Sequence, residues 1–225
     1  MGGIAALART DRIPIKHLLL LITGSAFAAA VLKLVIAGPA LPRLEDETGY
    51  HLQSLIFQSG ALKGALSLPA GVSVEAVRSA LSLAFVGQQG MEYYSLHLHG
   101  WPAFLSVMGA AGLAPFANIL LWALNILLFH RLVKMHLPAE KSEWTRILPM
   151  AVFCLSPLLL FLSNTYMAHT LALTLSLIIV HTHERIQGTL GGLVWIGLCL
   201  AAAFALVLVR PQALAPLAAG LLLTN

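Results

Sequence analysis

The chain has 225 residues, of which 59% are apolar and only 10% are charged, and its formal net charge is +4 at pH 7. Soluble domains are about half apolar and about one quarter charged, so this composition excludes an ordinary soluble protein and predicts an all-α integral membrane protein. Because the sequence has no basic stripe with interleaved aromatic residues, nucleic acid is also excluded as a partner.

Three basic residues, Arg9, Arg12 and Lys16, precede the first long apolar run, from His17 to Gly38. Basic residues favour the cytoplasmic side, so we expect a cytoplasmic N-terminus and a location in the inner or plasma membrane. The basic start and the alanines that follow also fit a cleavable signal peptide. A retained membrane anchor is favoured, since the run stays apolar to Ile36 and exceeds a usual signal core.

Residues 39–114 are then predicted to form an outer loop with membrane-surface helices. The first helix is expected to be amphipathic and interfacial, with a polar stripe at helical spacing. That stripe consists of Glu47, His51, Ser54 and Gln58. A second helix is expected at 74–85, ended by the glycines at 87 and 90. A third begins at Trp101, and the Trp and Tyr residues at span ends are expected to form an aromatic belt.

Further apolar runs follow, and we compare them with the roughly 20 residues that cross about 30 Å of hydrocarbon. With the first run they predict about six transmembrane helices in a single multi-pass domain, residues 1–225. The later spans, which occupy 115–225, are Pro115 to Val133, Leu148 to Ser163, Ala168 to Val180, Leu190 to Val209 and Ala213 to Leu223. Because the last run reaches the end of the sequence, we expect a truncated chain, the N-terminal part of a larger membrane protein.

Basic residues at 131–146 and at Arg185 mark two later cytoplasmic loops. By alternation of the spans, the other polar groups at span ends gather on the outer face. These are Asp46 and its neighbours, His97, His99, Asn164, His169 and Arg210. The outer face is therefore the predicted location of a functional site.

The acidic residues Glu45, Asp46 and Glu47 lie a few residues past the outer end of the first span. A carboxylate beside a bilayer is costly to place and often functional. Three roles stay open for it: a solvated cap that fixes the helix end, a general base toward an acceptor, or a ligand for a hard divalent cation. Asp46 suits the last two roles best, because Tyr50 and the polar stripe fix the backbone after it.

Two histidines and one arginine are the other candidates on this face. His97 and His99 are expected to point the same way on an extended segment, where imidazoles bind metals, shuttle protons or simply form hydrogen bonds. Arg210 precedes a proline at a span end. Its guanidinium either anchors the helix at lipid headgroups or binds a phosphate in bidentate geometry. Cys154 and Cys199 lie inside apolar runs and predict neither a disulfide nor a metal site.

Several motifs resemble the GT-C membrane glycosyltransferases, in particular the branch with protein O-mannosyltransferases, aminoarabinose transferases and Rgt-type enzymes. The shared pattern is a cytoplasmic N-terminus, one span, and an acidic motif that opens an outer loop with surface helices. The motifs are Asp46-Glu47-Thr48-Gly49-Tyr50-His51, His99-Gly100-Trp101-Pro102, Ser156-Pro157 through Asn164-Thr165-Tyr166-Met167-Ala168-His169-Thr170, and Arg210-Pro211. The resemblance extends over nearly the whole chain.

The resemblance implies a glycosyltransferase that moves a sugar from a polyprenyl-phosphate donor to a lipid, glycan or protein acceptor at the outer face, among membrane lipids. Asp46 would be the catalytic residue, which activates the acceptor or positions a metal. The substrate-binding residues would be Glu47, Tyr50, His99 and Arg210, with Arg210 on the lipid phosphate. A divalent metal ion, if it is the cofactor, would have Asp46, His97 and His99 as ligands.

Two other functions stay open. A multi-pass transporter or lipid flippase would couple the outer acids to protons or cations. Transporters, however, place polar groups near the membrane midplane on broken helices in paired repeats. Here the polar groups gather at one surface, which favours the glycosyltransferase. A non-catalytic membrane subunit would fit the truncated C-terminus that we expect.

Overall fold

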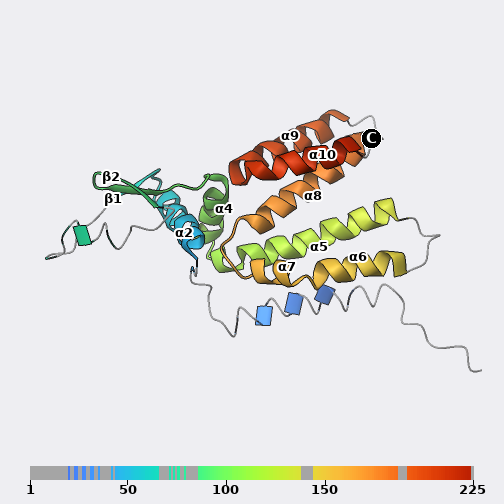
Figure 1. Ribbon diagram of the computed structural model, residues 1–225, viewed down its shortest axis with the longest axis horizontal. Coiled ribbons are helices and arrows are strands. Elements are labelled where there is room, and N and C mark those ends of the chain that lie inside the picture. The colour runs from blue at the N-terminus through green and yellow to red at the C-terminus, as the bar shows by residue number, and fades with distance from the viewer. Residues whose placement is uncertain are drawn as a thin grey trace, which may run out of the picture.

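The computed structural model describes residues 44–65, 86–137, 144–186 and 192–223, with isolated positions before 44 and from 71 to 79. The described chain is mostly helical and contains one small sheet (Figure 1). Its elements are α2 (Glu45–Gln58), β1 (Gly64–Ala65), β2 (Val86–Gln89), β3 (Glu92–Ser95), α4 (Gly100–Ala110), η1 (Ala114–Phe116), α5 (Ala117–His136), α6 (Trp144–Cys154), α7 (Pro157–Leu162), α8 (His169–Ile186), α9 (Gly192–Val209), η2 (Pro211–Ala213) and α10 (Leu214–Leu223). The predicted first span at 17–38 and the predicted helix at 74–85 lie largely outside the described residues.

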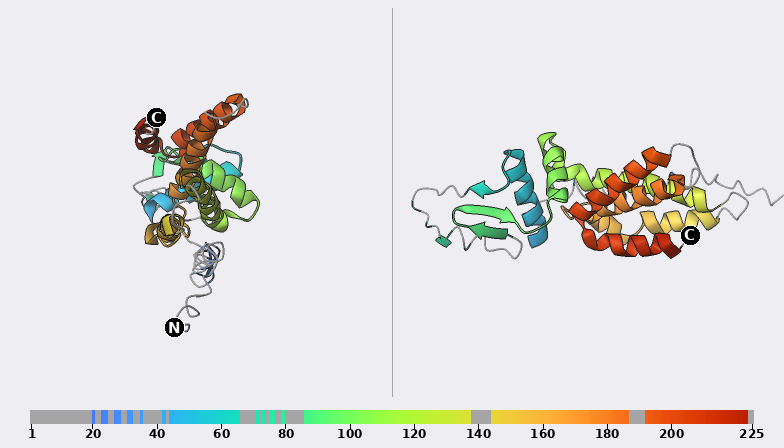
Figure 2. Two further views of the ribbon diagram at one scale, coloured as in Figure 1. Left: turned by 90° about the vertical axis from the view of Figure 1, so that its right-hand side faces the viewer. Right: turned by 90° about the horizontal axis from the view of Figure 1, so that it is seen from above.

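The molecule has two parts, which Figure 2 separates most clearly. Helix α2, the sheet and α4 form one end, and α5 to α10 form a helical bundle beside them. Within the bundle, α8 packs against both α5 and α9, and α6 packs against α5. One buried cluster joins the two parts, because it includes Tyr50 of α2, Trp101 of α4 and Leu206 of α9. This shared core fixes the end of α9 against α2 and α4.

Two described helices are long and apolar enough to cross a membrane, the continuous helix Ala114–His136 and α9. Helix α9 is exposed along most of its length, with Leu193 86% and Phe204 67% exposed. A helix that is apolar on all sides requires an apolar environment around its outer surface. The described residues therefore support two of the six predicted spans by length and composition.

The predicted span from Leu148 to Ser163 is two helices, because α6 ends at Cys154 and α7 begins at Pro157. Proline disfavours the α conformation at the residue before it, and Ser156 accordingly has ψ 117°. The Ser156 hydroxyl oxygen caps α7 by accepting a hydrogen bond of 3.5 Å from the Leu159 amide. The prediction of one continuous helix is wrong, because a proline at this position begins a helix more readily than it continues one.

A three-stranded antiparallel sheet lies in the predicted outer loop, so the all-α prediction is wrong there. The strand order is β1-β3-β2, and β2 and β3 form a hairpin in which Gln89 pairs with Glu92. The turn contains Gly90 at φ 62°, a conformation that glycine adopts without a steric penalty. Tyr93 follows in β3, where aromatic residues are favoured. Lys63 forms an ion pair of 2.9 Å with Glu92, the first residue of the central strand.

Candidate functional site

Helix α2 carries the three predicted acidic residues in its first turn. Negative charges at a helix N-terminus interact favourably with the helix dipole, which is a local reason for the helix to begin at Glu45. The three side chains nevertheless have different surroundings: Glu45 is exposed, Asp46 is half-buried and Glu47 is only 2% exposed. Asp46 is therefore the acid that lies at the boundary between the protein interior and its surroundings.

Part of the polar stripe of α2 faces the protein interior instead of a membrane surface, which corrects the sequence prediction. Glu47 is buried, whereas the apolar side chain of Leu55 is exposed. Gln53, which the predicted stripe omits, is fully buried. Its Oε1 accepts a hydrogen bond of 2.8 Å from the Ser95 amide, and its Nε2 donates one of 3.0 Å to the Leu62 carbonyl. These contacts satisfy a buried amide and hold α2 against β3.

The segment between β3 and α4 places the imidazole of His97 on the ring of Tyr50. The two rings stack with their centroids 4.2 Å apart. The pKa of Tyr50 is raised, mainly by burial; the charge of Arg210 opposes this shift and the charge of Asp46 adds to it. The pKa of His97 is lowered, again mainly by burial; here the charge of Asp46 opposes the shift and the charge of Arg210 adds to it. Both rings therefore lie within electrostatic reach of the same carboxylate and the same guanidinium.

Arg210 lies where α9 ends, next to Tyr50. Pro211 begins η2, and the backbone of Arg210 turns out of the helix with φ −158° and ψ 87°. The guanidinium lies beside the Tyr50 side chain and lowers the pKa of its phenol, against the effect of burial. Its Nε is buried and has no hydrogen-bond partner among the described residues. A buried donor of this kind is costly unless an ordered water or a ligand supplies the acceptor.

Gly100 lets the end of α9 approach the first turn of α4. A Cβ atom at this position would lie 2.8 Å from both the carbonyl carbon and the carbonyl oxygen of Leu208. Real Cβ atoms do not approach backbone atoms so closely, so the contact requires glycine. It holds the residues before Arg210 against the segment that begins at His97.

The loop from 163 to 168 is fixed by side chains of α4 and α5. Trp101 is fully buried, and its indole Nε1 donates a hydrogen bond of 2.6 Å to the Tyr166 carbonyl. Asn118 Nδ2 donates bonds of 2.6 and 2.9 Å to the carbonyl oxygens of Thr165 and Met167. The backbone of the loop thus has its partners inside the protein.

This loop delivers His169, the first residue of α8, to the same end of the bundle. His169 is within electrostatic reach of Arg210 and Asp46. Its Nδ1 is buried without a hydrogen-bond partner among the described residues. Nearby, the ring of His51 lies 5.0 Å from the ring of Tyr166, and burial lowers the pKa of His51.

The structure thus brings together predicted residues that are far apart in the sequence. We name this group the Asp46 site; it consists of Asp46, Tyr50, His97, His169 and Arg210. Glu47 lies beside the Asp46 site. Burial is the largest cause that raises the pKa of Tyr166, and the charge of Glu47 is the second. His99 is exposed, and its ring packs edge-on against Phe57 at 5.5 Å.

The predicted metal ligands do not assemble in this arrangement. His97 stacks on Tyr50 while His99 contacts Phe57, because the chain bends at residues 96–97 and residues two apart no longer point the same way. Across the described ranges, no three His, Cys, Asp or Glu side chains form a group that could hold a metal ion. A divalent metal ion stays a prediction from the sequence.

The sequence does not identify the buried side chains that hold the site residues in place. Trp101 and Trp122 are both buried in the core. Gln53 and Asn118 lie outside the predicted site, although a polar amide on a helix in apolar surroundings is a signal for a buried hydrogen bond. Asn118 lies at the start of a run of apolar residues, where such a bond is the main reason for an amide.

The Asp46 site combines a carboxylate, two imidazoles, a phenol and a guanidinium at one end of the bundle. A half-buried carboxylate can accept a proton from a hydroxyl group, and a guanidinium with an unused donor can bind a phosphate oxygen. Comparison with protein-family models, curated proteins and solved structures gave no match for this chain.

Proposed function

We propose that the protein is a membrane glycosyltransferase that transfers a sugar from a polyprenyl-phosphate donor to an acceptor, with Asp46 as the general base. The observation that carries the proposal is the placement of the Asp46 carboxylate and the Arg210 guanidinium around one tyrosine, Tyr50. A reaction between a hydroxyl acceptor and a sugar phosphate needs a base on one side and a cation on the other.

In the proposed reaction, Asp46 takes the proton of the acceptor hydroxyl as its oxygen attacks the anomeric carbon of the sugar. The bond between that carbon and the phosphate oxygen breaks, and its electron pair leaves with the lipid phosphate. Arg210 stabilises the negative charge on the departing phosphate, because its guanidinium presents donors in a fixed fork. Tyr50 lies beside the guanidinium, within electrostatic reach of both Arg210 and Asp46.

The proposal places the bundle in the cell membrane with the Asp46 site at the outer face and the basic ends of α5 and α8 inside. That orientation follows the positive-inside bias, since α5 ends in Lys134 and His136 and α8 in His183 and Arg185. The exposed apolar surface of α9 supports contact with lipid. The six-span arrangement belongs to this proposal, with α6 and α7 together as one broken span and α10 as part of the last.

The test is sugar transfer by membranes that contain the protein, supplied with polyprenyl phosphates that carry a tritiated hexose or pentose. Asp46→Asn keeps the shape of the side chain and removes its basicity, so we expect product formation to fall at least about 100-fold, the lower end of general-base effects. Glu45→Gln is the matched control, because Glu45 is an exposed acid in the same turn of α2.

Equal amounts of inserted protein are verified by immunoblotting and by protease protection of the N-terminus. Loss of transfer in Asp46→Asn together with retained transfer in Glu45→Gln supports the proposal. Transfer at the wild-type rate by a well-inserted Asp46→Asn protein would refute the role of Asp46. Uptake of the sugar into vesicles without a covalent product would assign the protein to the transporters instead.

A further inference from the structure

A cavity of about 550 Å³ lies beside α8 and α10, at the end of the bundle away from the Asp46 site (Figure 1). Two polar side chains line it, those of His136 at the end of α5 and of Glu184 near the end of α8. The remaining lining is apolar and consists of Val180 of α8 with Pro216, Leu217, Gly220 and Leu221 of α10. A mostly apolar lining with few polar groups is typical of a small-molecule site.

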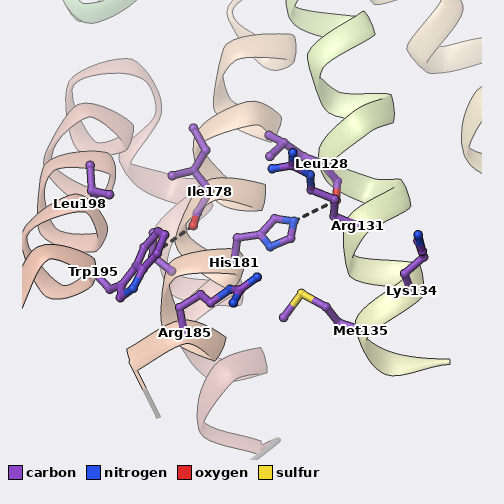
Figure 3. Close-up of a pocket in the computed structure, with 10 residues that line it drawn as sticks. Leu128, Arg131, Lys134, Met135, Ile178, His181, Arg185, Trp195 and Leu198 are labelled. Atoms are coloured by element: carbon purple, nitrogen blue, oxygen red, sulfur yellow. Dashed lines mark hydrogen bonds between the residues drawn. The ribbon is translucent and has the colours of Figure 1, made fainter. Parts of the chain in front are cut away.

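Two histidine contacts join α5 to α8 here and fix one wall of the cavity. His181 Nε2 lies 3.0 Å from the Leu128 carbonyl oxygen of α5, as Figure 3 shows. His136 Nε2 lies 3.3 Å from Glu184 Oε1 across the same two helices. The opposite wall is α10, where Pro216 and Gly220 are exposed. The cavity is therefore accessible from the side of the bundle.

The pair of His136 and Glu184 is neutral overall. His136 Nδ1 lies 3.1 Å from the Leu132 carbonyl oxygen, which can only accept, so Nδ1 carries a hydrogen. Nε2 and Glu184 Oε1 then share a second proton, because a ring lone pair would repel a carboxylate oxygen at 3.3 Å. An imidazolium beside a carboxylate and a neutral ring beside a carboxylic acid have the same total charge.

The pair leaves one group at the cavity with unused hydrogen-bonding capacity, the second carboxyl oxygen of Glu184. Both ring nitrogens of His136 are engaged, whereas within the described ranges Glu184 has a partner at Oε1 only. In either protonation state of the pair, Oε2 is an acceptor. No other charged side chain lines the cavity in the described part of the chain. The cavity thus offers one acceptor in neutral surroundings, next to an apolar volume.

We propose that this cavity binds a lipid whose polar end is a single hydroxyl group. The hydroxyl donates to Glu184 Oε2, and the apolar body lies along Val180, Leu217 and Leu221. A phosphate or carboxylate headgroup would bring only acceptors, and an ammonium headgroup would find no net charge to balance it.

The position of the acceptor along the bundle also favours such a lipid. The continuous helix Ala114–His136 is long and apolar enough to cross a membrane, and it ends at His136. The Glu184 carboxyl group is therefore level with the end of this candidate span, while the apolar lining lies toward its middle. A lipid alcohol in a bilayer has the same arrangement, with its hydroxyl at the surface and its body among the hydrocarbon chains.

The test is photo-crosslinking of the full chain in phosphatidylcholine nanodiscs, with hexadecanol that carries a diazirine in its chain. We expect saturable labelling of peptides from α8 and α10, identified by mass spectrometry. The methyl ether of this probe has no donor, so its labelling should be about fivefold lower, the effect of one hydrogen bond of typical strength. Equal labelling by the ether would overturn the proposal. Stronger labelling by the corresponding primary amine would also overturn it, because that result would indicate a negatively charged site.

Gly220→Phe should abolish the labelling, because a side chain at this position begins in open space and fills the cavity. Gly197→Phe is the matched control, a glycine of α9 with equally open surroundings outside the cavity, and should label like the wild type. Unchanged labelling in Gly220→Phe would refute the assignment.

Glu184→Met keeps a side chain of similar length without the carboxyl oxygens, so it should remove the advantage of the alcohol over its ether. Thermal unfolding shows whether each variant is folded, and Gly220→Phe decides the outcome if Glu184→Met unfolds. Competition with geranylgeraniol, dioleoylglycerol and cholesterol shows which apolar body the cavity accepts, and competition by none of them would contradict a lipid ligand. Sugar transfer is not measured, so the result is independent of the proposed function.

Discussion

The indole Nε1 of Trp101 donates a hydrogen bond of 2.6 Å to the main-chain carbonyl oxygen of Tyr166. This bond joins the first turn of α4 to the loop before α8, and both contribute to the surroundings of the Asp46 site. Trp101 is fully buried, so its partner has no access to water. The position of His169 at the Asp46 site depends on this loop, and through it on a residue that takes no part in the proposed reaction.

Removal of this bond should destabilise the protein. Trp101→Phe leaves the Tyr166 carbonyl buried without its donor, which should cost about 1–3 kcal/mol beyond the lost ring contacts. Trp122→Phe is the control, because Trp122 is equally buried and its Nε1 has no hydrogen-bond partner among the described residues. Unfolding of both variants in mixed micelles, followed by circular dichroism, gives the difference. Equal destabilisation would show that the bond contributes nothing.

Gly100→Ala should displace the end of α9. The added methyl group would lie 2.8 Å from backbone atoms of Leu208, and overpacking of this kind costs about 1–3 kcal/mol. Gly197→Ala, also in a helix but with open space around the new methyl group, should instead be stabilising by up to about 1 kcal/mol from helix propensity. The two melting temperatures should therefore shift in opposite directions, and shifts of the same sign would contradict the packing described here.

Acidification should destabilise the protein through two half-buried histidines. Burial is the largest cause that lowers the pKa of His51 and His97 below 6.5. The unfolded chain therefore binds more protons than the folded one between 6.5 and the lower folded values, and stability falls as the pH decreases through this window. Melting temperatures should decrease from about pH 7.5 to about pH 5.5.

In the double variant His51→Gln with His97→Gln, this dependence should become shallower. His183→Gln serves as the control, since His183 lies near the end of α8, away from the Asp46 site. An unchanged pH profile in the double variant would mean that other groups determine the acid sensitivity.

Arg210→Gln should impair use of the donor, if the proposed function is correct. A hydrogen bond to a charged group contributes about 1.5–3 kcal/mol, so kcat/KM for the lipid-linked sugar should fall roughly 10- to 150-fold. Arg210→Lys keeps the charge without the forked donors and should recover only part of the activity. Initial rates at varied donor concentration provide the measurement. A wild-type kcat/KM in Arg210→Gln would remove this residue from the reaction.

The sequence predicts which residues of the site lie on the same face, but it does not predict the packing contacts that bring them together. Alternation of the apolar runs places Asp46, His97 and Arg210 on one face, and the structure has them at one end of the bundle. Their closeness depends on Gly100 and Trp101, whose partners Leu208 and Tyr166 come from distant parts of the chain. Such pairings have no local pattern, because hydrophobic periodicity reports which side of a helix is buried and not what buries it.

The errors in the predicted fold have local causes. Pro157 is visible in the sequence and marks the helix boundary inside the predicted span, so apolar length alone was too weak a criterion. The hairpin around Gly90 combines a turn glycine with tyrosines on a flanking strand. This combination is a local signal for a hairpin, but it is easily overlooked in a chain whose other segments are mostly helical. His99 was expected to act beside His97, and a bend between them, which spacing cannot reveal, separates their contacts.

The contact between Gly100 and the end of α9 also restricts how this protein can vary. The atoms that a side chain at position 100 would meet first are the main-chain carbon and oxygen of Leu208. Main-chain atoms are the same in every amino acid, so no exchange at position 208 can make room for a larger residue at 100. Functional sequences that keep this arrangement are thus confined to glycine there, and a relative with any other residue at that position must end α9 differently.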